Sequence, residues 1–363
     1  MRLLVTGATG FLGSELVPRL VAAGHEVIAL VRDPQRYTPP PGIQVVKGDI
    51  TAFNLGLKTP VEVEAIFHVA AMVSFKESDR AAIYAANCRG TTNVVNFCLN
   101  HHIGSVFYCS TVYVCGDCSG QWTESCYNQG QEFRNHYERS KFLAEGYLRE
   151  AARGFAGIDE PLAVTIFRPS IIVGRASDGQ ATTFEGFYKP VWAMARAMAL
   201  VESRLPPREV MEAKLHLPPL RVPLSIHGDP RGTLNLVPVD WVAAKMVTAV
   251  GVDQSAAGSR PVGVNQSLTY HLVNPHPLTN AQVCAAMAKA LGMRGPHFSL
   301  TPPKDPLSKL YNRLIRPFFP YLQGEPTFAS SVSDDCPGGV ELVETVVRYW
   351  RGQQKGDHGA TRH

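Results

Sequence analysis

Short apolar runs alternate with amphipathic stretches along the first half of the chain. The apolar runs predict strands at residues 2–6, 26–31, 43–46, 65–68, 105–109 and 163–167. Helical spacing of apolar residues predicts helices at 11–23 and about 81–100. Short continuous runs rich in β-branched residues are typical of parallel strands that are buried on both faces. The alternation of strand and helix therefore predicts an α/β fold built on a doubly wound parallel sheet.

A glycine-rich turn, TGATGFLG, follows the first predicted strand directly. Gly7 permits a tight turn, Gly10 lets the backbone approach a pyrophosphate, and Gly13 lets the next helix pack close to the strand. The start of that helix offers free N–H groups to phosphate. Strand, glycine turn and helix in this order predict a Rossmann-type dinucleotide site. Four neighbouring residues are then expected to contact the cofactor: Thr6, Thr9, Phe11 and Leu12.

The end of the second predicted strand bears on which dinucleotide is bound. An acidic residue there accepts the ribose 2′-OH of NAD, but this chain has Val31 followed by Arg32. A guanidinium can pair with a 2′-phosphate instead. Asp33 competes for the role, although it lies further along and precedes Pro34. We therefore expect NADPH (NADP) as cofactor, the alternative being a solvated arginine at a strand end.

The Gly-x-x-Gly-x-x-Gly spacing resembles the extended short-chain dehydrogenase/reductase family, and further landmarks of that family follow in order. They are KGDI, HVAA, an N-x-x-G-T-x-N-V helix, STVYV, Y-x-x-x-K and RPSIIVG. The resemblance implies an adenine contact at Asp49 and Ile50, and close packing of Val69, Ala70 and Ala71 under the cofactor. It further implies a nicotinamide wall formed by Pro169, Ser170 and Ile171, with a structural role for Arg168.

Tyr137 and Lys141 lie one helical turn apart and so share a helix face. In the resembling family this pair performs carbonyl reduction together with a hydroxyl, here Thr111, with Ser110 as the alternative. Tyr137 would protonate the carbonyl oxygen, Lys141 would lower the pKa of that phenol, and Thr111 would donate a second hydrogen bond. Asn87 corresponds to a buried amide with either a structural or a proton-relay role.

The segment after Gly174, RASDGQATTFEGFYKPVWAMARAMA, resembles the thioester-reductase-like branch, also called the male-sterility or fatty acyl reductase branch. That resemblance implies an acyl thioester substrate, on coenzyme A or a carrier protein. Reduction would give a hemithioacetal, then aldehyde and thiol, and in some members an alcohol. Candidate substrate contacts, with simple core packing as the alternative, are Val73, Phe184, Phe187, Tyr188 and Trp192.

Three other functions remain open on the sequence. A hydroxysteroid- or flavanol-type dehydrogenase would share the fold and act on a ring ketone. A nucleotide-sugar epimerase would use NAD and usually keep an acidic residue after the second strand. A non-catalytic NADPH-sensing protein would generally lose the Tyr137 and Lys141 pair, which this chain retains.

Composition changes this picture little. The net charge of +4 is scattered, which disfavours a nucleic-acid partner. No apolar run reaches the roughly 20 residues of a membrane span, and the N-terminus does not read as a signal peptide, so we expect a cytoplasmic protein. Residues 307–324 mix basic and apolar positions, which suits a peripheral membrane contact, a carrier protein or an ordinary packed helix. Cys115 and Cys118 form a C-x-x-C without a second matched pair, so we expect no metal.

We expect a Rossmann domain at residues 1–174. Two later segments, 234–250 and about 268–275, are expected to belong to the same domain. Residues 175–233 and 276–352 would form a substrate-binding region, and 353–363 a disordered tail. The proline-rich stretch 206–230, with His216 and His227, reads as a loop without a catalytic role. The resemblance also suggests homodimers that pair through the helices carrying Asn87 and Tyr137.

Overall fold

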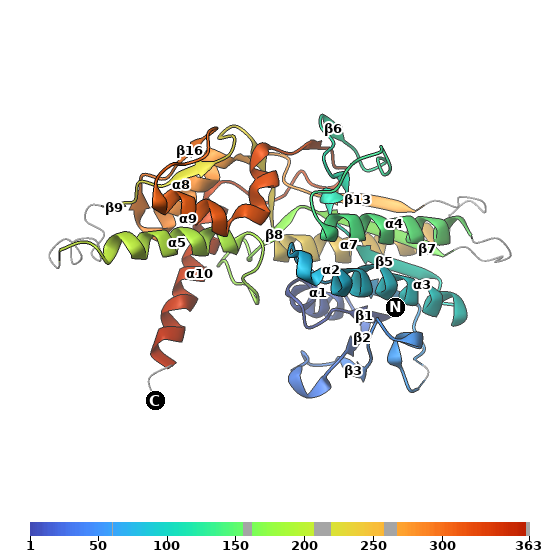
Figure 1. Cartoon of the computed structure of the whole chain (residues 1–363). Helices are drawn as coiled ribbons and strands as arrows, with labels where there is room; N and C mark the ends of the chain where they lie inside the picture. The colour runs from blue at the N-terminus through green and yellow to red at the C-terminus, as the bar shows by residue number, and fades with distance from the viewer. Residues whose placement is uncertain (60, 155–161, 207–218, 258–266, 361–363) are drawn as a thin grey trace. The chain divides into compact units, whose positions relative to one another are not determined.

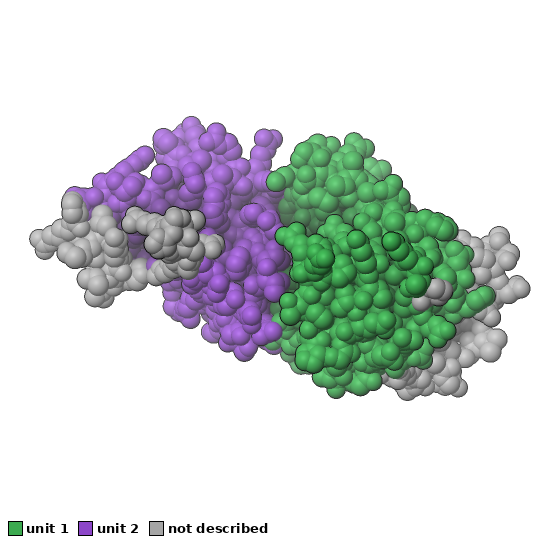
Figure 2. Space-filling model, turned by 90° about the horizontal axis from the view of Figure 1, so that it is seen from below, with its two compact units in different colours: residues 1–170, 239–273, 327–335 green, residues 171–238, 274–326, 336–363 purple. Residues whose placement is uncertain are grey.

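The computed structural model describes residues 1–59, 61–154, 162–206, 219–257 and 267–360 (Figure 1). The chain divides into two compact units, coloured separately in Figure 2. Unit 1 comprises Met1–Ser170, Val239–Val273 and Thr327–Asp335. Unit 2 comprises Ile171–Pro238, Asn274–Pro326 and Cys336–His363. The chain thus passes from one unit to the other at Ser170, rather than at the expected Gly174.

Unit 1 is built on a seven-stranded sheet of order β13-β7-β5-β4-β1-β2-β3, and every pairing in it is parallel. The α/β, doubly wound fold predicted from the sequence is confirmed. The strands are β1 (Arg2–Thr6), β2 (Glu26–Val31), β3 (Gln44–Lys47), β4 (Ala65–His68), β5 (Ser105–Cys109), β7 (Ala163–Pro169) and β13 (Leu268–Leu272).

Helices cover the sheet of unit 1. Apolar side chains of α3 (Gly90–Asn100) and α4 (His136–Arg153) form one buried cluster with β1, β2, β4, β5 and β7. These two helices lie in front of the sheet in Figure 1. The helices α1 (Phe11–Ala22) and α7 (Val239–Ala257) pack against each other. A short parallel pair, β6 (Gln121–Trp122) with β17 (Thr327–Phe328), brings the segment 327–335 back to unit 1.

The single helix expected at about 81–100 is wound in three parts. It begins as α2 (Arg80–Tyr84), continues as the π-helical turn η4 (Ala85–Arg89), and ends as α3. Asn87 lies in the π-helical turn. Such turns are inserted where one extra residue must be accommodated in a helix, and they are frequent at functional sites. Apolar periodicity alone could not distinguish this winding from a regular helix.

The described residues also form five 3₁₀ elements. They are η1 (Pro34–Arg36), η2 (Phe53–Gly56), η3 (Glu77–Asp79), η5 (Val112–Cys115) and η6 (Arg316–Gln323). The first four belong to unit 1, and η6 belongs to unit 2.

Unit 2 contains four helices among its described residues: α5 (Tyr188–Glu202), α8 (Asn280–Leu291), α9 (Pro306–Leu314) and α10 (Val340–Ala360). Thr279 begins α8 with a capping box, in which its side chain accepts from Gln282 N and the Gln282 side chain accepts from Thr279 N. Two-stranded ladders join β8 (Ile171–Val173) to β12 (Leu236–Pro238), β9 (Leu220–Arg221) to β15 (Met293–Arg294), β10 (Ser225–His227) to β16 (His297–Ser299), and β11 (Thr233–Leu234) to β14 (Leu278–Thr279).

The C-terminal segment differs from expectation. Residues 353–363 were expected to be disordered, but α10 continues to Ala360, while 361–363 lie outside the described residues. The reason is that propagating a helix costs much less than starting one. The packed first part of α10, which includes buried Val343, Val346 and Trp350, provides the nucleus.

Candidate active site

The glycine turn of unit 1 lies directly against the segment that follows β4. Gly7 has φ +75°, and a Cβ added there would lie 2.6 Å from the N of Ala70. A Cβ on Gly13 would lie 2.1 Å from the carbonyl oxygen of Gly7. Gly10 is the N-cap residue of α1 and has no side chain to cap the helix. The turn therefore forms a bare backbone cradle at a helix N-terminus, which fits the pyrophosphate of a dinucleotide.

A buried histidine braces this cradle, and the sequence analysis did not identify it. His68, at the end of β4, bonds through Nδ1 to Thr6 Oγ1 at 2.8 Å and through Nε2 to Thr91 Oγ1 at 3.1 Å. The N–H of Ala70 donates to the same Thr6 oxygen at 3.3 Å. Burial, and then the charge of Lys141, lower the pKa of His68 to about 3, so this histidine is neutral. Its position at the end of a central strand, in HVAA, was the available signal.

The end of β2 carries a cation without a competing carboxylate. Val31 is buried, whereas Arg32 is exposed and forms no ion pair among the described residues. The Asp33 carboxylate accepts from the N–H of Gln35 at 3.2 Å and so caps η1. Arg36, the last residue of η1, is also exposed. Both the Arg32 guanidinium and the Asp33 carboxylate are exposed after β2, and one oxygen of Asp33 is used in a local hydrogen bond.

The turn after β3 holds the predicted adenine contacts Asp49 and Ile50. One oxygen of Asp49 accepts from both the N–H and the hydroxyl of Thr51, each at 2.8 Å. From α3, Asn93 Nδ2 donates to the carbonyl oxygens of Ile50 at 2.7 Å and Ala52 at 3.2 Å. The second asparagine of the N-x-x-G-T-x-N-V motif is therefore a brace for this turn, a role that sequence reasoning missed.

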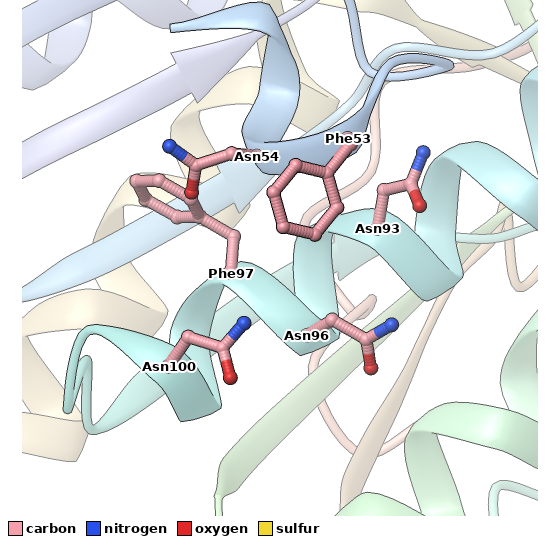
Figure 3. Close-up of a pocket in the computed structure, with 6 residues that line it drawn as sticks. All are labelled: Phe53, Asn54, Asn93, Asn96, Phe97 and Asn100. Atoms are coloured by element: carbon pink, nitrogen blue, oxygen red, sulfur yellow. The ribbon is translucent and has the colours of Figure 1, made fainter. Parts of the chain in front are cut away.

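A pocket of about 240 Å³ lies between η2 and α3, behind the same turn (Figure 3). Phe53 projects from η2 toward the helix in this view, and it is 89% exposed. The lining residues are Phe53, Asn54, Asn93, Asn96, Phe97 and Asn100. The lining is made of amides and two aromatic rings, without a charged side chain.

The predicted catalytic pair lies near the start of α4. The Asn135 side chain caps this helix by accepting from the N–H of Glu138 at 3.0 Å. Tyr137 is half-buried, and Lys141 is fully buried one turn later. The ammonium of Lys141 donates to the carbonyl oxygen of Cys109 at 2.7 Å and to the phenol oxygen of Tyr108 at 3.3 Å. The pair is thus fixed beside the carboxyl end of β5, where ligands bind in sheets of this kind.

Burial dominates the electrostatics of the pair. Burial, then the Cys109 thiol and the Glu138 carboxylate, raise the pKa of Tyr137 above its ordinary value of 10. Burial lowers the pKa of Lys141 to about 8, while Cys109, Glu145 and Cys88 act in the opposite direction. The net shift of the Tyr137 pKa is upward, and the Lys141 ammonium donates hydrogen bonds to residues of β5.

The hydroxyl residues after β5 differ in their contacts. Thr111 Oγ1 donates to the carbonyl oxygen of Pro169 and accepts from the N–H of Tyr113, both at 3.3 Å. Ser110 is buried, and its N–H donates to the carbonyl oxygen of Phe167 at 2.7 Å. Both hydroxyls belong to unit 1.

Asn87 uses its whole amide within unit 1. Its oxygen accepts from the N–H of Met72 at 2.8 Å, and its Nδ2 donates to the Met72 carbonyl at 3.0 Å and to Ser140 Oγ at 2.9 Å. Ser140 lies on α4 between Tyr137 and Lys141, and it donates to the carbonyl oxygen of Tyr137 at 2.7 Å. Asn87 therefore joins the segment after β4 to the helix that carries Tyr137. These contacts favour the structural role over a relay.

A buried ion network holds the third turn of α4. Arg168 on β7 is 0% exposed and donates to both oxygens of Glu145, at 2.9 and 2.6 Å. It also donates to the Cys126 carbonyl at 2.8 Å. Burial raises the pKa of Glu145, but the Arg168 guanidinium more than offsets this, and the net shift is downward. His271 on β13 lies 3.4 Å from the same guanidinium, and burial and that charge lower its pKa to about 4. The geometry is that of a structural arginine.

Comparison with known proteins identifies the family. Residues 40–246, more than half of the chain, match the NAD-binding family described as male sterility protein. The chain belongs to this family. It is 32% identical over 183 residues to "Sterol demethylase protein B" of Methylococcus capsulatus, covering 48% of this chain and 52% of that protein. It is 32% identical over 178 residues to "2-alkyl-3-oxoalkanoate reductase" of Stenotrophomonas maltophilia, with the same two coverages. The chain spans about half the length of these curated relatives.

Among solved structures, this male sterility family member resembles the terminal R domain from the myxalamid PKS-NRPS biosynthetic pathway. The TM-score is 0.67 at 22% identity, over 97% of this chain and 91% of that chain. At this identity the likeness supports the fold. Together with the family match, it places the chain among the extended short-chain dehydrogenases/reductases, which are NAD(P)-dependent.

The predicted substrate and nicotinamide contacts divide between the two units. Pro169 and Ser170 are buried in unit 1, and Val73 is exposed there. Ile171 begins β8 in unit 2. In the same unit, Phe187 and Tyr188 are buried, and the Tyr188 hydroxyl accepts from the N–H of Gly174 at 3.0 Å. Their surroundings are those of a packed core. Phe184 is half-buried and Trp192 is exposed, with the Arg196 guanidinium 5.6 Å from its ring.

The remaining sequence features have ordinary structural roles where they are described. The basic segment 307–324 forms α9 and η6, and Asn312 fastens α9 by accepting from the N–H of His227 at 2.8 Å. His216 lies outside the described residues. Within the described ranges, no three histidine, cysteine or acidic side chains gather as a metal site, and no helix is long and apolar enough to span a bilayer.

Proposed function

We propose that the protein is an NADPH-dependent reductase of a carbonyl group, with an acyl thioester as substrate and an aldehyde as product. The observation that carries the proposal is the pairing of Tyr137 and Lys141 on α4. Lys141 is fastened to the end of β5, within the same unit as the glycine cradle. A structural pair would not require a buried cation and a half-buried phenol at the ligand edge of the sheet.

The roles of the side chains follow from their chemistry. When bound, the reduced nicotinamide supplies a hydride. The carbonyl oxygen of the substrate then gains negative charge, and Tyr137 donates a hydrogen bond and a proton to it. Thr111 donates a second hydrogen bond to the same oxygen. The Lys141 ammonium, next to a phenol whose pKa burial raises, stabilises the phenolate left after proton transfer.

The thioester substrate is supported by the family match and by the likeness to a terminal R domain of a PKS-NRPS pathway. Such a substrate would reach the site on coenzyme A or on a carrier protein, and a second reduction would give the alcohol. The same side chains can also reduce a ketone. The names of the two matched relatives, a 2-alkyl-3-oxoalkanoate reductase and a sterol demethylase protein, favour that second candidate.

A substrate panel separates these two functions. Acyl-coenzyme A esters, aldehydes, 3-oxoacids and cyclic ketones would be offered with NADPH, and products identified by mass. Aldehyde or alcohol formed from the thioester supports the first function. Turnover of ketones alone would assign the second, and no turnover of any carbonyl would refute both.

Tyr137→Phe tests the proton donor. We expect turnover to fall at least about a hundredfold while NADPH binding persists, because only the reacting carbonyl loses a partner. Tyr147→Phe is the matched control, since it also removes a phenol hydroxyl from α4. The Tyr147 hydroxyl donates to Asn96 at 3.0 Å. Equal turnover in the two variants would remove Tyr137 from the mechanism.

Arg32→Ala tests the cofactor preference. Affinity for NADPH should fall by about tenfold or more, and affinity for NADH should hardly change, because only NADPH carries the 2′-phosphate. Arg153→Ala, at the other end of α4, is the control. An equal loss of affinity for NADPH and NADH would show that Arg32 does not bind the 2′-phosphate.

A further inference from the structure

A second phenol lies beneath the catalytic lysine. Tyr108 is the fourth residue of β5 and is completely buried. The Lys141 ammonium donates to its oxygen at 3.3 Å and lies 4.6 Å from the centre of its ring. The Cys109 carbonyl accepts from the same ammonium at 2.7 Å. The mechanism proposed above uses neither oxygen.

The groups that face Lys141 come from four elements. From β5 they are Tyr108 and the thiol of Cys109, and from η4 the thiol of Cys88. The other two elements are α4, which contributes Glu145 and, one turn before the lysine, Tyr137, and β4, which contributes the neutral His68. Among these side chains, the phenol oxygen of Tyr108 is the one that accepts a hydrogen bond from the ammonium.

We propose that Tyr108 is a positioning residue for Lys141. Its phenol oxygen and the Cys109 carbonyl form a two-oxygen cradle that holds the ammonium at the carboxyl end of β5. An acceptor for an ammonium stabilises the charged form, whereas burial favours the neutral amine. Burial lowers the pKa of Lys141 to about 8, close enough to neutrality that the loss of one acceptor changes how much of the lysine is charged. This inference rests on the proposed role of Lys141 in the reductase site.

Tyr108→Phe removes the oxygen and keeps the ring. A hydrogen bond to a charged group is worth about one pKa unit or more, so the pKa of Lys141 should fall by about one unit. Lysine labelled with ¹³C at Cε reports this titration directly in the cofactor-free protein, and Lys141→Arg identifies its signal. Tyr311→Phe, which removes a buried phenol from unit 2, is the control and should leave the transition where it is.

Two outcomes would overturn the proposal. One is an unchanged Lys141 transition in folded Tyr108→Phe, and the other is an equal shift in Tyr311→Phe. If Tyr108→Phe does not fold, tyrosine labelled at Cζ in the wild-type chain gives the same answer. One Cζ signal should move with the Lys141 transition and stop moving in Lys141→Met. Absence of any such signal would also overturn the proposal.

The pH dependence of turnover tests whether Tyr108 affects the reaction through Lys141. In Tyr108→Phe, the alkaline limb of the pH–rate profile should move down by about one unit, while the plateau below it changes little. A merely structural defect would lower the plateau and leave the limb in place. The labelling experiment needs neither substrate nor cofactor. If the Lys141 transition shifts in Tyr108→Phe but the protein has no reductase activity, the positioning role of Tyr108 is supported and the proposed function is refuted.

Discussion

Glu145→Gln should destabilise unit 1 strongly, because it leaves a buried guanidinium without its counter-charge. Arg168 is 0% exposed, and both oxygens of Glu145 accept from it, at 2.9 and 2.6 Å. Arg149 also reaches Glu145, at 3.4 Å. The glutamine has nearly the same shape, so the substitution removes the charge and one acceptor while keeping the volume.

The magnitude follows from where the pair lies. Breaking a buried ion pair by removing one partner costs about 3–5 kcal/mol, because the remaining charge stays desolvated. Glu150→Gln is the matched control on the same helix. Glu150 pairs with Arg153 at 2.6 Å, but both side chains are more than 60% exposed (61% and 64%), and pairs of this kind contribute less than about 1 kcal/mol. The two variants should therefore differ by at least about 2 kcal/mol.

Urea unfolding followed by circular dichroism would measure the free energy of unfolding, and hydrogen exchange of the α4 amides would assign the loss to unit 1. Arg168→Met added to Glu145→Gln should recover much of the stability, since the double variant no longer buries the Arg168 guanidinium. Equal losses in Glu145→Gln and Glu150→Gln would refute the reasoning. So would a double variant no more stable than Glu145→Gln alone.

Two further predictions concern the glycine turn and the buried histidines. Gly13→Ala forces a methyl group to within 2.1 Å of the Gly7 carbonyl oxygen, so it should lower the free energy of unfolding by about 1–3 kcal/mol and weaken NADPH binding. Gly104→Ala is the control and should do neither, because a Cβ at Gly104 has nothing within 4 Å. The pKa values of His68 and His271, lowered to about 3 and about 4, lie below the ordinary 6.5, so the unfolded chain binds more protons than the folded one. Stability should therefore be full above pH 6.5 and fall on acidification by up to about 1.4 kcal/mol per pH unit for each histidine. Unfolding midpoints between pH 7 and 4.5 would check this, and a slope unchanged by histidine-to-glutamine substitution would contradict it.

The fold was predictable because its signals are local. The buried strands β1, β2 and β5 were predicted with the bounds that the structure gives, since continuous apolar runs end at glycine or polar turns. The π-helical turn at Asn87 and the helical continuation of α10 have no comparable signal, because each depends on what packs beside it.

The sequence identifies the candidate catalytic pair, but it does not show the electrostatics of the pair. Tyr137 and Lys141 were found from a spacing of one helical turn, which the sequence displays directly. The pKa of Lys141 is set by burial and then by Cys109, Glu145 and Cys88, two of which come from other elements. The sequence spacing also does not show that the Lys141 ammonium donates to two oxygens of β5.

Two sets of contacts fix the position of α4, the helix that carries Tyr137 and Lys141. Near its start, the Asn87 amide donates to Ser140, and Ser140 donates to the Tyr137 carbonyl. One turn beyond Lys141, the carboxylate of Glu145 is held by Arg168. Reaction rates depend steeply on the placement of catalytic groups. Supporting contacts of this kind hold the side chains in place, so that substrate binding does not have to order them. The buried pair of Glu145 and Arg168 therefore holds α4 about two turns beyond the proposed proton donor Tyr137, and its contribution to position can exceed its net contribution to stability.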